Sequence, residues 1–347
     1  MSRGARQRER KYQFLGFILS VCLVLLVAIA CQPPPAQIET APSQVEFLDP
    51  EPDVNLTLIQ HGACPWAYFW CVVETGIKDA AKNLNVNVTI LRPSDFDLDK
   101  VEKMLQAAVE ADPQPDGIGI ALVDRDRFKA PLQQAVERKI PVIAYNSGFD
   151  ADKAGIPYRT YIGADEYAGG YQAGERLIDA GGKRGVCINH QPGHEGLDER
   201  CRGFANAMKE KALDVPQILE VSTNPAESKR LIRAFYKRNP EVDTFLTLGP
   251  EVAAPFYEFV AEVDLKPGTF VHGTFDLSNT ILQNIKAGTT LVAVDQQPYL
   301  EGYMVVQWLT WIHRHGFSPP EKMIATGPNL VDQKNVDLVL EQVSKYR

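Results

Sequence analysis

Short apolar runs alternate, from residue 54 onward, with segments in which apolar residues recur every three or four positions. This alternation predicts parallel strands whose connecting helices cover both faces of a sheet. The strand candidates are 54–59, 86–91, 117–123, 140–145, 185–189, 217–221, 244–248, 268–273 and 290–294. They are too many for one compact doubly wound sheet. We therefore expect an α/β fold with two doubly wound, Rossmann-like lobes.

Polar side chains follow three of these strands. Asn146 comes after the strand at 140–145, Asp276 follows the apolar run that ends at 275, and Gln296 follows the strand at 290–294. Open parallel sheets bind ligands outside the carboxyl ends of their strands. Asp, Asn and Gln supply the fixed hydrogen-bond donors and acceptors that a hydroxyl-rich ligand needs. These residues are therefore candidate ligand contacts.

An aromatic cluster lies beside the end of the first strand, in the stretch HGACPWAYFWC at 61–71. Aromatic faces cover the apolar C–H side of a sugar ring. We expect one or more of Trp66, Phe69 and Trp70 to stack on a ligand. The alternative interpretation is a purely structural aromatic cluster in the core.

The segment 189–201, NHQPGHEGLDERC, crowds histidines and carboxylates just after a strand. We expect a binding loop in which His190 and Asp198 contact the ligand. The alternatives are a structural loop and a metal-dependent hydrolase that uses His190 and His194. The H-E-x-x-H pattern is absent, and Pro192 with the glycine after it interrupts any helix through the pair. Phosphate-binding, dinucleotide-binding and esterase motifs are also absent. We therefore expect no enzyme activity, no cofactor and no metal.

The N-terminus carries an export signal. Five basic residues precede the uncharged apolar run 14–30, which is followed by Cys31. The block AIAC resembles a bacterial lipobox, so we predict a signal peptide at 1–30 and lipidation of Cys31. An uncleaved membrane anchor is the alternative. Both interpretations place the rest outside the cytoplasm, attached through a proline-rich tether at 31–53.

The exported part of the chain is acidic. Without residues 1–30 it holds 31 basic and 43 acidic residues, a net charge of −12. This charge argues against nucleic acid as a partner.

Four cysteines remain after Cys22 in the signal and Cys31 are set aside. In an oxidising compartment we expect the pairs nearest in sequence, Cys64–Cys71 and Cys187–Cys201. Four free buried thiols are the alternative. A zinc site is less expected, because no C-x-x-C motif occurs.

The sequence resembles the sugar-binding branch of the type 1 periplasmic binding proteins, the ribose-binding-protein-like receptors of ABC importers. The landmarks are YFWCVVETGIKDAAK, IPVIAYNSG, YIGADEYAGGYQAGERL, ERCRGF, GTFDLS and AVDQQPYLEGY. The resemblance implies two lobes joined by three crossings with the sugar in the cleft between them. It places the N-terminal lobe at 54–164 plus 297–325 and the C-terminal lobe at 165–296 plus 326–347.

The resemblance also assigns site residues. The ring-stacking aromatic positions fall on Phe69 and Trp70, the polar positions after the fourth strand on Asn146 and Ser147, the strand-end acid on Asp276 and the amide on Gln296. Ribose-type receptors carry Asp-Arg at 146–147, an amide at Gly249 and an arginine near Asp198. The altered set implies a ligand other than ribose.

We therefore expect a monomeric solute-binding lipoprotein that captures a monosaccharide or cyclic polyol and delivers it to an ABC transporter permease. A lipoprotein that senses such a ligand and signals to a membrane receptor is the alternative from another functional class.

Overall fold

The structure is a computed structural model that describes residues 54–343 and 345–347. The predicted signal peptide, Cys31 and the tether at 31–53 lie outside the described residues. The described chain forms one compact unit that contains two six-stranded sheets. None of its helices combines the length and apolar character needed to cross a membrane.

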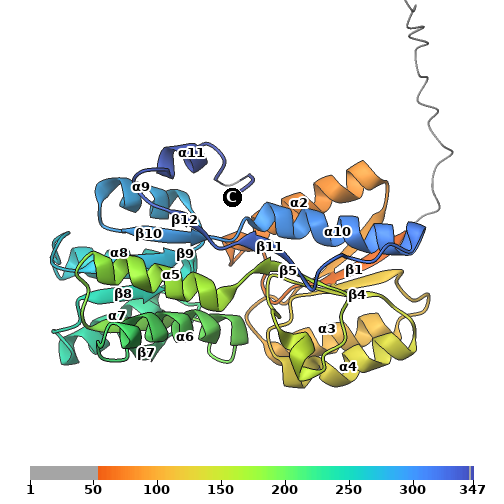
Figure 1. The fold of residues 1–347 in the computed structure, drawn as a ribbon, viewed down its shortest axis with the longest axis horizontal. Helices are drawn as coiled ribbons and strands as arrows, with labels where there is room; N and C mark the ends of the chain where they lie inside the picture. The colour runs from red at the N-terminus through yellow and green to blue at the C-terminus, as the bar shows by residue number, and fades with distance from the viewer. Residues whose placement is uncertain (1–53, 344) are drawn as a thin grey trace, which may run out of the picture. The chain divides into compact units, whose positions relative to one another are not determined.

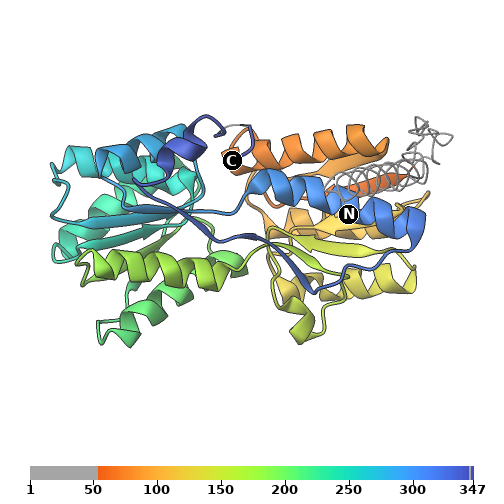
Figure 2. The ribbon, with the colours of Figure 1, turned by 45° about the horizontal axis from the view of Figure 1, so that its top comes forward.

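The first sheet is parallel throughout. Helices α2 (Tyr68–Leu84) and α10 (Pro298–His315) lie side by side on one face (Figures 1 and 2). Helices α3 (Leu98–Glu110) and α4 (Arg125–Glu137) cover the other. We call this sheet with its helices the first lobe. The strands in spatial order are β11 (Met323–Gly327), β5 (Tyr161–Ala164), β4 (Val142–Tyr145), β3 (Gly117–Ile120), β1 (Asn55–Ile59) and β2 (Asn87–Leu91).

The second sheet has the same strand order, except that its edge strand β12 runs antiparallel to its neighbour. Helices α5 (Glu166–Asp179) and α6 (Glu195–Glu210) pack on one face. The other face is covered by α7 (Pro225–Arg238), α8 (Pro250–Glu262), α9 (Asn279–Ala287) and α11 (Val336–Leu340). This is the second lobe. Its strands in spatial order are β12 (Asn329–Val331), β10 (Val292–Asp295), β9 (Val271–Phe275), β8 (Thr244–Thr247), β6 (Gly185–Asn189) and β7 (Gln217–Glu220).

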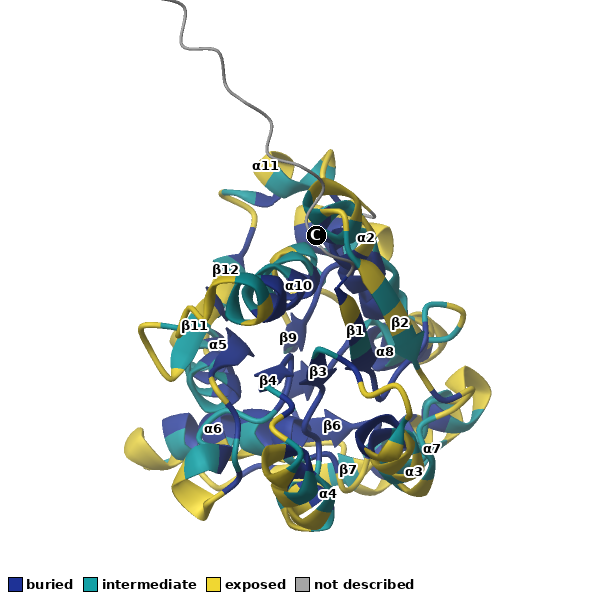
Figure 3. Cartoon of the chain, turned by 90° about the vertical axis from the view of Figure 1, so that its right-hand side faces the viewer, coloured by how far each residue is buried: buried dark blue, intermediate teal, exposed yellow. Residues whose placement is uncertain are grey.

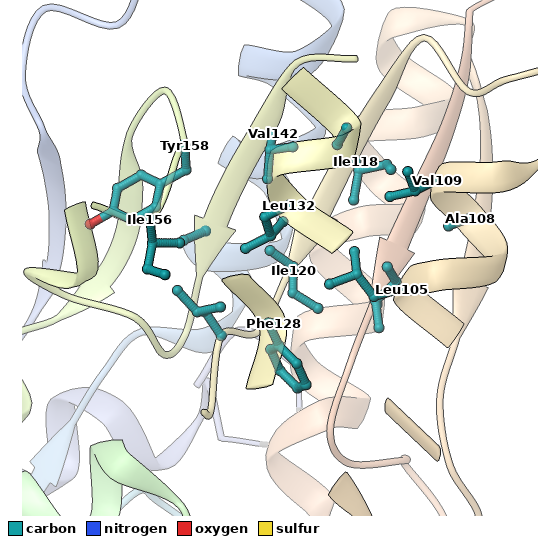
Figure 4. Packing of buried hydrophobic residues seen from close by; sticks show 14 of the residues in the cluster. Leu105, Ala108, Val109, Ile118, Ile120, Phe128, Leu132, Val142, Ile156 and Tyr158 are labelled. Carbon is teal, nitrogen blue, oxygen red and sulfur yellow. The ribbon is translucent and has the colours of Figure 1, made fainter. Parts of the chain in front are cut away.

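Burial follows the apolar pattern of the sequence. Most strands are buried and the helices expose only their outer sides (Figure 3). In the first lobe, Leu105 of α3 and Phe128 of α4 pack on Ile118 and Ile120 of β3 (Figure 4). Side-chain oxygens of Asp97 and Asp124 accept backbone N–H groups at the starts of α3 and α4, which stabilises both helix ends.

Helices α2 and α10 approach unusually closely. A Cβ atom at Gly76 would lie 2.1 Å from the Tyr299 carbonyl oxygen, and one at Gly302 would lie 2.1 Å from the Val73 carbonyl oxygen. No real Cβ atom tolerates such a distance from backbone. The two glycines therefore set the spacing of the helix pair that covers the first sheet.

The chain passes between the two lobes three times, after β5, after β10 and between β11 and β12. The predicted fold class is thereby confirmed: two α/β lobes with parallel sheets and three crossings. The exact residues at which each lobe begins and ends stay a prediction.

Both predicted disulfides are present, Cys64–Cys71 and Cys187–Cys201. The first joins the turn after β1 to α2, and the second joins β6 to α6. Each bond therefore ties a strand, or the turn after it, to the helix that follows.

Candidate functional site

Side chains from both lobes surround one small cavity, which we call the crevice. Its volume is about 40 Å³. In the first sheet the strand order reverses between β1 and β3, and in the second between β6 and β8. Open α/β sheets bind ligands at this switch point. The crevice is lined by His61, Ala67, Phe69, Trp70, Asn146, His190, Gln191, His194, Leu197, Arg200, Glu251, Asp276 and Gln296.

Asp276 and Gln296 contact each other at the ends of two neighbouring strands. The Gln296 amide nitrogen donates a 2.5 Å hydrogen bond to the Asp276 carboxylate. Burial raises the pKa of Asp276 to about 6, although Arg200 and this hydrogen bond oppose the shift. Asp276 has a left-handed backbone with φ of 62°. The pair thus places an acid and an amide together on the second lobe's side of the crevice.

Arg200 is a buried cation held by several acceptors. Its Nε and one terminal nitrogen donate to Glu166 over 2.6 and 2.9 Å, and the other terminal nitrogen donates to the Leu248 carbonyl over 2.9 Å. The guanidinium also lies 4.2 Å from the centre of the Phe275 ring. Burial alone would lower the pKa of Arg200, but the Glu166 carboxylate raises it above its usual value. Two of its five N–H groups remain for a ligand.

Three histidines face the crevice from both lobes. His61 follows β1, His190 follows β6, and His194 precedes α6. The rings of His61 and His194 meet edge to face with their centres 4.5 Å apart. Burial lowers the pKa of His61 and of His190 to about 3, and lowers that of His194 well below its usual value. All three imidazoles are therefore neutral in this structure.

Glu251, in the first turn of α8, approaches His190. The distance from Glu251 Oε2 to His190 Nε2 is 3.7 Å, too long for a hydrogen bond. Burial raises the pKa of Glu251 to about 7. No direct hydrogen bond stabilises an ion pair here, so burial keeps both groups close to neutral.

Gly249 explains why His190 fits at this position. A Cβ atom on residue 249 would lie 3.2 Å from His190 Cε1 and 3.0 Å from Glu251 Oε2. A larger residue would therefore compete with the imidazole for space. The glycine noted in the sequence as a departure from ribose-type receptors makes room for this histidine.

Several buried polar atoms of the crevice have no hydrogen-bond partner among the described residues. They are His61 Nδ1, His190 Nδ1 and Gln296 Oε1. An unpaired buried polar atom costs about 1–3 kcal/mol, so proteins rarely retain one without a use. Their convergence on one cavity marks it as a site for a ligand with its own donors and acceptors.

The structure brings most of the predicted site residues together. Those that line the crevice are Phe69, Trp70, Asn146, His190, Asp276 and Gln296. Trp70 is 2% exposed, and its ring meets His61, Phe69 and Tyr145 edge to face. The aromatic cluster thus belongs both to the core and to the crevice wall.

Three predicted residues lie away from the crevice. The Trp66 indole nitrogen donates to the Pro93 carbonyl over 3.4 Å, toward the edge of the first lobe. Asp198 is exposed in the first turns of α6 and accepts a hydrogen bond from the Asn189 amide over 3.0 Å. Ser147 is buried next to Asn146 but lines a different hollow.

That hollow is a groove of about 520 Å³. Charged side chains of both signs line it, and they pair with one another, for example Arg125 with Glu195 over 2.7 Å and Arg202 with Glu199. Arg125 belongs to the first lobe and Glu195 to the second. Ser147 Oγ is buried there without a partner in the described chain.

The sequence did not lead us to assign four of the lining residues to the site: His61, Gln191, Arg200 and Glu251. It suggested a role for His194 only in the alternative of a metal-dependent hydrolase. His61 had a signal, since it stands two residues after the predicted strand at 54–59. Arg200 and Glu251 lie on helices, and only tertiary packing brings them to the crevice. The part of the chain that is described holds no group of three or more His, Cys, Asp or Glu that could bind a metal ion.

The fold and site have counterparts among known proteins. A sequence profile for the family described as periplasmic binding protein domain matches residues 67–312. The chain therefore belongs to this family, whose members are extracytoplasmic binding proteins rather than enzymes.

Among individual relatives, the chain is 25% identical over 249 residues to the xylose/arabinose-binding protein XylF of Sulfolobus acidocaldarius. This alignment covers 68% of the chain and 61% of the relative, less than two thirds of its length.

Two solved structures are similar over almost their whole length. A carbohydrate transporter from Acidothermus cellulolyticus in complex with myo-inositol shares 29% identity, with a TM-score of 0.76 and coverage of 84% of this chain and 99% of that one. A periplasmic sugar-binding protein from Legionella pneumophila shares 27% identity, with a TM-score of 0.72 and coverage of 79% and 99%.

Proposed function

We propose that this protein is an extracytoplasmic solute-binding lipoprotein that captures a monosaccharide or cyclic polyol in the crevice and delivers it to an ABC importer. The observation that carries the proposal is the set of unpaired buried polar atoms at the facing ends of two parallel sheets. Hydroxyls both donate and accept hydrogen bonds, so a polyhydroxylated ligand satisfies imidazole, amide and carboxylate groups together.

The composition of the crevice supports an uncharged ligand. Its permanent cation, Arg200, is already paired with Glu166, so little positive charge remains for a phosphate or carboxylate group. Phe69 and Trp70 supply aromatic surface for the C–H face of a ring. The named ligands of the relatives, xylose or arabinose and myo-inositol, are also uncharged.

Ligand capture requires the lobes to separate. The crevice volume of about 40 Å³ is close to the ~30 Å³ share of one water molecule and far below the roughly 300 Å³ at which small-molecule pockets begin. The three crossings provide the hinge for such an opening. The structure thus corresponds to a closed form.

A thermal-shift screen against pentoses, hexoses, inositols and nucleosides tests the proposal. We expect one or a few compounds to raise the melting temperature, with micromolar or tighter affinity by calorimetry. Asp276→Ala and Gln296→Ala should each weaken binding at least tenfold, because each removes a polar group from a dry site. The matched controls are Asp126→Ala and Gln106→Ala, both at exposed positions. Binding that is equally strong in all four variants would place the site elsewhere.

Membrane attachment is tested separately. We expect the wild-type protein to incorporate radioactive palmitate and Cys31→Ser to lose this label. Wild-type protein that stays in the membrane without any label would instead support an uncleaved anchor.

A further inference from the structure

The chain holds six histidines, and they fall into three groups. His313 and His315 lie in the last turn of α10. His272 is buried in the second lobe, and both its ring nitrogens are occupied: Nε2 lies 3.0 Å from Thr247 Oγ1 and Nδ1 lies 2.9 Å from Thr290 Oγ1. His61, His190 and His194 form the third group, which we call the histidine cluster.

The histidine cluster differs from His272 in what it leaves unpaired. His61 and His190 are each 5% exposed, yet the Nδ1 atom of each lacks a partner among the described residues. A structural histidine of the core, such as His272, satisfies both nitrogens. The two unpaired atoms belong to a wall of the crevice, so a bound ligand is the group that can reach them.

His194 is fixed in one protonation state by its place in the fold. It is the N-cap of α6, and its Nδ1 accepts the backbone N–H of Leu197 over 3.3 Å. An acceptor nitrogen carries no proton, so the proton of the neutral ring is on Nε2. A second proton would break this cap and add positive charge at a helix N-terminus, where the helix dipole opposes it.

We propose that His61, His190 and His194 contact the ligand as neutral imidazoles. The proposal rests on the function proposed above and names the groups that set its specificity. A neutral imidazole offers one donor and one acceptor, and a hydroxyl group can meet either. A phosphate or an ammonium group can meet only one of them.

The experiment uses the tightest binder among D-xylose, L-arabinose, D-glucose, D-galactose and myo-inositol. Proton–carbon NMR spectra of the imidazole Cε1–H groups are recorded during its addition at pH 7. We expect three of the six histidine signals to shift. The signals of His272, His313 and His315 should stay in place and serve as internal controls.

Variants assign the signals and test the energetic role. His61→Gln, His190→Gln and His194→Asn should each weaken binding about fivefold or more at pH 7, and asparagine at 194 retains the helix cap. The matched controls His313→Gln and His315→Gln should keep the wild-type affinity.

The outcomes separate the two proposals. If no compound of this panel or of the wider screen binds, the proposed function fails. If a compound binds while the cluster signals stay unmoved, or while all three cluster variants keep the wild-type affinity, the histidine proposal is overturned and the receptor function stands.

Discussion

The buried ion pair between Arg200 and Glu166 gives the sharpest test of how the second lobe is stabilised. Both side chains are about 5% exposed or less, and two hydrogen bonds of 2.6 and 2.9 Å join them. Glu166→Gln removes the negative charge and leaves the guanidinium buried without a counter-ion. Breaking one partner of such a pair costs about 3–5 kcal/mol. At about 2 °C per kcal/mol for a protein of this size, the melting temperature should fall by ~6–10 °C.

The matched control lies on α6, next to Arg200 in the sequence. Glu199→Gln breaks the pair with Arg202, whose side chains are 34% and 58% exposed. An exposed pair contributes about 1 kcal/mol at most, so this variant should lose ~2 °C or less. Scanning calorimetry at pH 7 without ligand measures both. Equal losses in the two variants would refute the reasoning, because burial would then have no bearing on the strength of the pair.

Three further predictions concern stability. Replacing Cys187 and Cys201 together by alanine should lower the free energy of unfolding in urea by about 3 kcal/mol, since the bond closes a loop with a sequence separation of 14; an unchanged urea midpoint would contradict this. Gly76→Ala should lower the free energy of unfolding by about 1–3 kcal/mol, because α2 and α10 are in close contact at this glycine. An ordinary helical Gly→Ala change raises the free energy of unfolding by about 1 kcal/mol. The sign of the change in a urea titration therefore decides whether the close contact matters. Asp276→Asn should stabilise the closed form described here by ~2–3 kcal/mol at pH 8 and by almost nothing at pH 4. Because the pKa of Asp276 is raised in the folded protein, ionising this carboxyl costs free energy of folding. The cost is absent below the unfolded-state pKa of about 3.9 and complete above about pH 6–7. Equal effects of the substitution at both pH values would be evidence against the buried charge.

The sequence predicted the interior of both sheets well because buried parallel strands are continuously apolar. The run 185–189 coincides with β6, and 86–91 differs from β2 by one residue. The prediction at 268–273 ended early, since β9 continues through Thr274 to Phe275. Thr274 hydrogen-bonds Thr247 inside the sheet, and a threonine that finds its partner on another strand has no signature in local sequence.

Three strands were missed for different reasons. β11 and β12 are edge strands with largely unburied residues, so they lack an apolar run. β5 is fully buried but has only four residues, including Gly163. A segment this short is not distinguished from a loop by periodicity alone.

The candidate site was predictable only where a polar residue directly follows a strand. Asn146, Asp276 and Gln296 met that rule and line the crevice. The same rule, extended by one residue, would have selected His61. Arg200 could not be found in this way, because its burial depends on Glu166, 34 residues away. Trp66 was chosen for its residue type, and local packing directs its indole to Pro93 instead.

The first lobe is assembled from distant parts of the chain, and this bears on how the protein is made. Its sheet is completed by β11, and one face is covered by Val305, Val306 and Leu309 of α10. A nascent chain that has emerged only as far as β10 has α2 but not α10 to cover that face. We expect the lobe to stay unfolded until synthesis is nearly finished, because contacts so far apart in sequence form slowly. A chain that delays folding in this way remains threadable through an export channel.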